Sequence, residues 1–132
     1  MKNGAPAVVI GLVVAAGSLV AVPVANADID FYCRPGCWGA IAASPSTGEE
    51  AIRLNYRTRN QAEDAAIMWC DVMGKTNDCR VLTSGLGCLS IAESSDGNAF
   101  EARTALTLDA ADAAALDGAG PGSRIGLHDC NG

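Results

Sequence analysis

Three arginines gather within one short stretch of an otherwise acidic chain. The chain carries 9 Lys and Arg against 15 Asp and Glu, a net charge of −6. On an extended strand, Arg53 and Arg57 share one face with Asn55, and planar guanidinium groups suit carboxylate or phosphate groups. We therefore predict a binding site for a protein or an anionic ligand, consisting of Arg53, Asn55, Arg57 and Arg59. The alternative is a solvated strand face whose arginines pair with nearby acids.

The sequence offers little that would support catalysis. His128 is the only histidine, so a histidine mechanism would have a single general base. Asp129, next to it, points to the opposite face if both lie on a strand. We therefore interpret His128 as a surface imidazole near a disulfide. Asp109 and Asp112 can be paired carboxylates, but we interpret them as acids in the first turn of a helix, where they favour the helix dipole.

Six cysteines occur in the chain: Cys33, Cys37, Cys70, Cys79, Cys88 and Cys130. An even number in an exported protein indicates three disulfides and leaves no thiolate for catalysis. Zinc sites usually combine two ligand clusters, and only Cys33 and Cys37 show such a spacing. We therefore expect no metal ion and no other cofactor.

Residues 1–27 have the composition of a secretory signal peptide. Lys2 gives a positive start, Ala5–Val24 is apolar and small, and Ala25-Asn26-Ala27 supplies a cleavage site. We predict that cleavage leaves one secreted domain, residues 28–132, outside the cell or in its envelope. An uncleaved membrane anchor is the alternative. After cleavage we expect no stable membrane insertion, and the acidic charge argues against nucleic acid as a partner.

The chain repeats itself weakly. Ile41–Ser44 is similar to Ile91–Ser94, and Ala62–Ala66 is similar to Ala110–Ala114. Each copy predicts a strand, a turn, a second strand, a helix and a third strand. The fold class is therefore α+β, with two weakly similar strand-strand-helix-strand units that form one sheet or two sheets, covered by two helices and stapled by disulfides.

Local patterns place the elements of both units. The predicted strands are 38–43, 51–56, 80–83, 89–92, 99–105 and 124–127. In the second strand, Ile52, Leu54 and Tyr56 should share a face. Thr58 should cap a helix that ends near Gly74, and Thr107 should cap one that ends near Gly118. The buried stripe of the first helix is predicted from its spacing as Ala62, Ala65, Ala66, Trp69 and Met73.

Three sequence segments carry a resemblance to a known family. They are Trp38–Ser44, Arg59-x-x-Ala62-Glu63-x-Ala65, and Asp78–Leu82 with Cys70 and Cys88 nearby. The chain resembles domain-of-unknown-function family 4189, small secreted actinobacterial proteins, over roughly residues 39–130. The resemblance implies a fold, export and disulfides, but no chemistry. Cys33 and Cys37 depart from the pattern and look like an addition.

The weak repeat also predicts how the cysteines pair. The second copy has Gly118 and Ser123 where the first has Cys70 and Cys79, so the partners of one disulfide are missing together. Cys88 and Cys130 follow the third strand of each unit, and their bridge should lock the units together. Cys33 and Cys37 then pair across a Pro-Gly turn. The rival pairing joins Cys33 or Cys37 to Cys88 or Cys130.

We therefore predict an exported, non-enzymatic binding domain with an unknown partner. One alternative is a secreted enzyme, of the hydrolase type. Another is an inhibitor of an exported enzyme that presents a projecting loop, Ser44–Gly48. The sequence does not predict an oligomeric state.

Overall fold

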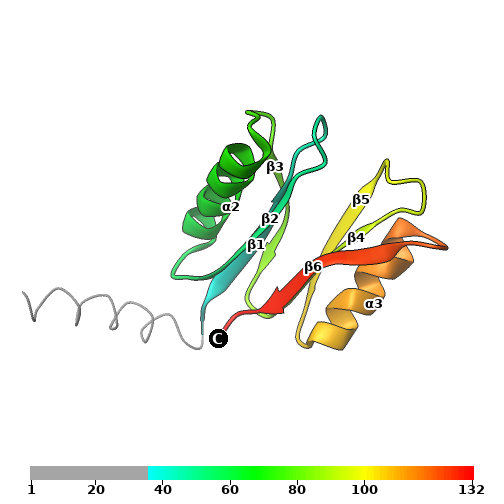
Figure 1. Cartoon of the computed structure of the whole chain (residues 1–132). Coiled ribbons are helices and arrows are strands. Elements are labelled where there is room, and N and C mark those ends of the chain that lie inside the picture. Colours follow the sequence, from blue (N-terminus) through cyan, green and yellow to red (C-terminus); the bar gives the residue numbers. More distant parts are fainter. Residues whose placement is uncertain (1–35) are drawn as a thin grey trace, which may run out of the picture. The chain divides into compact units, whose positions relative to one another are not determined.

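The computed structural model describes residues 36–132 (Figure 1). None of the helices in this range is long and apolar enough to cross a membrane. The predicted signal peptide, residues 1–27, lies outside the described residues. The elements, in chain order, are β1 (Trp38–Ala43), β2 (Glu50–Tyr56), α2 (Arg59–Gly74), β3 (Arg80–Gly85), β4 (Cys88–Glu93), β5 (Phe100–Ala105), α3 (Leu108–Ala119) and β6 (Arg124–Cys130).

The predicted order of elements is confirmed in both units. Each unit runs strand, strand, helix, strand, and each builds its own antiparallel sheet with the first strand in the centre. Sheet 1 has the order β2-β1-β3 and sheet 2 the order β5-β4-β6. The sequence does not distinguish between one sheet and two sheets, and the structure has two. The origin of this likeness in a duplication stays a prediction.

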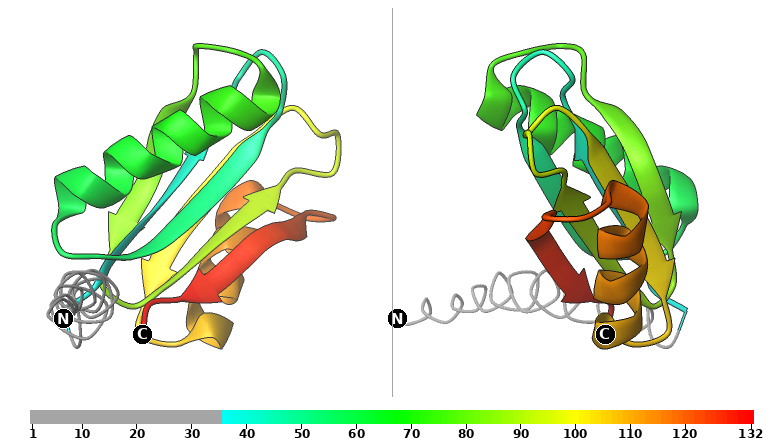
Figure 2. Two further views of the ribbon diagram at one scale, coloured as in Figure 1. Left: turned by 60° about the vertical axis from the view of Figure 1, so that its left-hand side comes forward. Right: turned by 90° about the vertical axis from the view of Figure 1, so that its right-hand side faces the viewer.

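The two sheets pack face to face between the two helices, which lie on the outside (Figure 2). The core between the sheets contains Ile41 of β1 with Leu89 and Ile91 of β4, all fully buried. A second core between α2 and sheet 1 consists mainly of alanine. Small side chains therefore set the distance between helix and sheet, and larger aliphatic side chains fill the space between the sheets.

The predicted buried stripe of α2 is partly wrong. Ala62, Ala66 and Cys70 are fully buried, whereas Trp69 is 44% exposed and Met73 is 53% exposed. The buried line is rotated toward Cys70, which is held by a disulfide to the start of β3. Alanine allows a close approach between helix and sheet that leaves no room for a tryptophan, so the large side chains emerge beside the contact.

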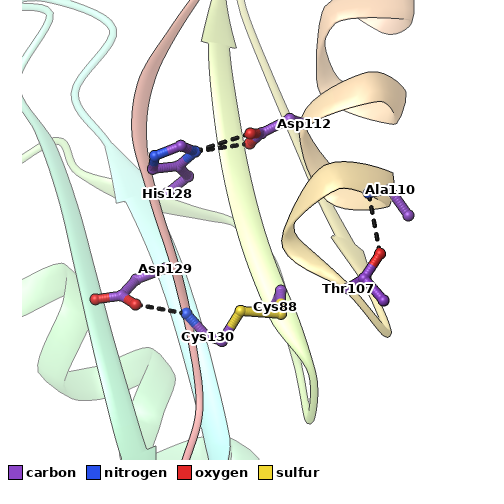
Figure 3. Close-up of polar contacts among 7 residues, drawn as sticks. All are labelled: Cys88, Thr107, Ala110, Asp112, His128, Asp129 and Cys130. Atoms are coloured by element: carbon purple, nitrogen blue, oxygen red, sulfur yellow. Dashed lines mark hydrogen bonds and ion pairs between the residues drawn. A yellow bond between two sulfur atoms is a disulfide. The ribbon is translucent and has the colours of Figure 1, made fainter.

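Both predicted helix caps are present. The hydroxyl of Thr58 accepts a hydrogen bond from the backbone N–H of Gln61 at 3.1 Å, and Thr107 accepts one from Ala110 at 3.2 Å (Figure 3). Helix α2 continues through Gly74, and the left-handed residue beyond it is Lys75. A side chain at Gly74 would collide with Glu49, so this glycine permits close packing rather than a left-handed turn.

The predicted alternation in β2 fails at its end. Ile52 and Leu54 face the core between the sheets as predicted, but Tyr56 packs on the opposite side, against the core under α2. Asn55 has a φ of 69°, and the pairing of β1 with β2 shifts register here. Such an irregularity re-aims the following side chain, and no periodic sequence pattern signals it.

The predicted disulfides Cys70–Cys79 and Cys88–Cys130 are both present. The first joins α2 to the start of β3. The second joins the beginning of β4 to the end of β6 within sheet 2 (Figure 3), so it does not lock the two units together as predicted. Cys37 is also disulfide-bonded, and its predicted partner, Cys33, lies outside the described residues.

Candidate functional site

Large exposed apolar side chains of α2 lie next to an arginine of sheet 1. Four apolar residues of α2 are between 44% and 63% exposed, and their spacing places them along one side of the helix. The predicted Arg53 of β2 borders them, because its guanidinium group lies over the ring of Trp69. We call this surface the Arg–Trp face, and it comprises Arg53, Met68, Trp69, Val72 and Met73.

Two of the predicted arginines form cation–π contacts with tryptophans. The guanidinium carbon of Arg53 lies 4.9 Å from the centre of the Trp69 ring, and that of Arg59 lies 4.8 Å from the Trp38 ring. Neither arginine forms an ion pair with any residue from 36 to 132. Stacking uses the face of the guanidinium group and leaves its in-plane N–H donors available. Both arginines can therefore receive a carboxylate.

The other two predicted site residues have different places. Asn55 accepts a hydrogen bond from the backbone N–H of Gly132 at 2.7 Å, and its own backbone N–H donates to the side chain of Asn131 at 2.9 Å. It therefore holds the C-terminal segment against the end of β2, a structural role. Arg57 is exposed in the short link between β2 and α2.

The sequence reasoning missed the apolar half of this surface. The helical spacing predicts Trp69 and Met73 to be buried, and it predicts no role for Met68 or Val72. A signal was present, because Met68 and Val72 fall outside any single buried stripe and make α2 apolar on an exposed side as well. The burial of Cys70 sets the rotation of α2 about its axis. This burial depends on the Cys70–Cys79 disulfide, which the sequence alone does not establish.

A serine, a histidine and an aspartate meet on the other side of the molecule. His128 of β6 lies 2.9 Å from both carboxylate oxygens of Asp112 of α3 (Figure 3), and Ser90 of β4 is the strand partner of His128. Asp112 is therefore not a first-turn acid as predicted, whereas Asp109 is. The Ser90 side chain is fully buried, and its hydroxyl has no partner among the described residues. A substrate cannot reach it, so the three residues are not arranged as a catalytic triad.

Comparison with known proteins identifies a family. The family described as Domain of unknown function (DUF4189) matches residues 38–130. The NMR structure of Rv1813c from Mycobacterium tuberculosis is similar, with 30% sequence identity and a TM-score of 0.58, over 72% of this chain and 75% of that chain. No protein with a curated description matches. The match over most of the chain shows that this protein belongs to the DUF4189 family, whose function is unassigned.

Proposed function

We propose that this protein is an exported, non-enzymatic interaction domain whose Arg–Trp face binds an acidic, apolar segment of a partner protein. The observation that carries the proposal is the exposure of Met68, Trp69, Val72 and Met73 beside Arg53, which forms no ion pair with residues 36–132. Tryptophan, methionine and arginine are enriched at protein interfaces and contribute much of their binding energy. Disulfides and the signal-like residues 1–27 support export.

The second unit shows that the fold does not require this surface. Arg103 of β5 pairs with Ser90 as Arg53 of β2 pairs with Ala40, so the two arginines hold equivalent positions. Arg103 is bound to Glu101 at 2.6 Å. Its guanidinium lies beside Gly118. Counted from the N-cap threonines, Gly118 is the counterpart of Trp69 and not of Cys70, so the helix alignment predicted from the sequence is wrong by one residue. One unit therefore carries an exposed tryptophan and an open arginine where the other carries a glycine and a neutralised arginine.

The charges select an acidic protein segment rather than a membrane or a nucleic acid. The chain has a net charge of −6, which opposes approach to anionic lipids and phosphate backbones. Arg53 favours carboxylates, and the apolar residues favour a partner that can cover them. A peptide segment with acidic and large apolar side chains supplies both features.

Selection of random 12-residue peptides displayed on phage tests the proposal. We expect the wild-type protein to enrich peptides that combine Asp or Glu with large apolar residues. Arg53→Gln and Val72→Ser should each weaken the selected peptides about tenfold or more. The matched controls are Arg103→Gln, at the equivalent strand position, and Leu106→Ser, which removes an apolar side chain that is 93% exposed outside the face. Both controls should bind like wild type.

Two results would overturn the proposal. In the first, the selected peptides bind Arg53→Gln and Arg103→Gln with equal affinity. In the second, the protein binds vesicles containing phosphatidylglycerol and loses this binding on Val72→Ser, which would assign the face to a lipid surface.

A further inference from the structure

A cleft of about 660 Å³ opens between the β1–β2 turn and the β4–β5 turn, at one end of the two sheets. Its apolar wall is formed by Ala43, Leu82 and Phe100, which belong to the core between the sheets. Ser46 of the first turn and Asn98 of the second lie on its polar rim. A volume of this size is within the range of small-molecule sites.

The first turn is held by one carboxylate. Asp78 accepts hydrogen bonds from the hydroxyl of Ser44, from the hydroxyl of Thr76 at 2.8 Å and from the backbone N–H of Ser46 at 3.2 Å. These hydrogen bonds, that of Ser44 above all, lower the pKa of Asp78 to about 2. The carboxylate therefore remains ionised at neutral pH and fixes the Ser44–Gly48 turn, the segment that the inhibitor alternative would use as a projecting loop.

The second turn has the same device. Asp96 accepts hydrogen bonds from the hydroxyl of Ser94 at 2.7 Å and from the backbone N–H of Asn98 at 3.0 Å. These bonds, led by that of Ser94, lower the pKa of Asp96. Both turns that border the cleft are thus ordered before any ligand arrives, which reduces the entropy cost of binding.

The cleft contains an arginine whose side chain has no acidic partner in the part of the chain that the structure describes. Glu93 lines the cleft but is bound to Arg124 at 2.6 Å. Arg80 also lines it, and its side chain forms neither an ion pair nor a hydrogen bond with any residue from 36 to 132. The strand register explains why Arg124 has an acidic partner and Arg80 has none among the described residues. Arg124 lies opposite Glu93, whereas Arg80 lies at the equivalent position opposite Ala43.

We infer that this cleft binds a small carboxylic acid with an apolar body. The carboxylate pairs with the guanidinium of Arg80, since bidentate geometry favours that pairing. The apolar body lies against Phe100 and Leu82, and the polar rim accepts hydrogen-bonding substituents. This site is separate from the Arg–Trp face, so it stands or falls independently of the proposed function.

Titration with benzoate, followed by amide NMR shifts of the protein, tests the inference. We expect saturable shifts at Ser46, Thr47, Gly97 and Asn98, and binding of benzamide at least about tenfold weaker because it lacks the charge. Arg80→Gln should weaken benzoate about tenfold or more, and Arg80→Lys should weaken it less. The control Arg103→Gln, an arginine on β5 that does not line the cleft, should bind like wild type.

Three outcomes would overturn the inference. They are shifts that do not saturate, equal affinities of wild type and Arg80→Gln, and shifts confined to residues of α2. Because Arg80 is exposed, its replacement should leave the melting temperature nearly unchanged. Weaker binding by the variant would then report on the ligand contact and not on unfolding.

Discussion

Replacing Glu50 with glutamine should make the protein more stable at pH 8 and leave its stability unchanged at pH 4. Glu50 opens β2 and faces sheet 2, where its carboxylate fills the space beside Gly126 of β6. Burial raises the pKa of Glu50 to about 7, and repulsion by Glu93 and Glu49 adds to the effect, while Arg124 opposes it. These groups come from the β1–β2 turn, β4 and β6, so the charge is trapped where the sheets meet.

The sign follows from proton linkage. The folded state holds this proton more tightly than the unfolded chain, whose Glu50 has the ordinary pKa of 4.5. The free energy of unfolding is therefore highest below pH 4.5 and falls as the pH rises from 4.5 to about 7. At about 1.4 kcal/mol for each pH unit, the full effect is about 3 kcal/mol. Glu50 is only partly buried, and solvent screening reduces this figure to about 1–2 kcal/mol.

Urea unfolding followed by tryptophan fluorescence, at pH 4, 5.5, 7 and 8, measures this difference. The Glu50→Gln variant should gain about 1–2 kcal/mol over wild type at pH 8, and the two curves should meet at pH 4. The control Glu101→Gln removes a carboxylate from an ion pair with Arg103 on the far side of sheet 2 and should give no gain at pH 8. A Glu50→Gln protein that is no more stable than wild type at pH 8 would refute the reasoning.

Three other changes test the packing. Ser90→Ala should stabilise the protein by about 1 kcal/mol, because the buried hydroxyl has no hydrogen-bond partner among the described residues. The equivalent residue of β1 is the fully buried Ala40, so the position accepts an alanine. A lower free energy of unfolding in urea would contradict this. Cys130→Ser should lower the melting temperature more than Cys37→Ser. The Cys88–Cys130 disulfide closes a loop of 42 residues and contributes about 4 kcal/mol, against about 2 kcal/mol for the short loop between Cys37 and its predicted partner Cys33. Peptide mapping without reductant identifies the partner of Cys37. Gly87→Ala should cost more than about 2 kcal/mol, because the added methyl group meets the backbone carbonyl oxygen of Ala105. Gly97→Ser should cost only about 1 kcal/mol, because a side chain there has room and only its positive φ is unfavourable. Similar melting temperatures of the two variants would contradict this.

The elements that the sequence predicted well are those set by local chemistry. Thr58 and Thr107 cap helices because their hydroxyls reach the backbone N–H groups of the first turn, and this needs no tertiary contact. Alternation placed Ile52 and Leu54 correctly for the same reason. The disulfides Cys70–Cys79 and Cys88–Cys130 could be predicted by comparing the two halves of the sequence with each other. That comparison needs no knowledge of tertiary packing.

The errors concern tertiary packing. The rotation of α2 depends on Cys70, whose position is fixed by Cys79 across the helix–sheet contact. The reversal at Tyr56 depends on an irregular residue, Asn55, whose side chain is used to hold the C-terminal segment. Whether the strands form one sheet or two depends on how the two units pack against each other. No local sequence pattern carries that information. The sequence shows that the arginines lie close together along the chain, but the tryptophan rings beneath Arg53 and Arg59 depend on how α2 packs on sheet 1.

Comparison of the two units separates what the fold needs from what it carries in addition. Both helices bury alanines against their sheets: Ala62 and Ala66 in α2, and Ala111 and Ala115 in α3. This shared pattern is sufficient for the packing of helix on sheet. The exposed Trp69 and the open arginines of the first unit have no counterpart in the second, although the second unit folds with the same topology. The shared topology therefore does not require them. In the proposed function, the partner covers these large apolar side chains, and its acidic groups pair with an arginine that has no ion pair within residues 36–132.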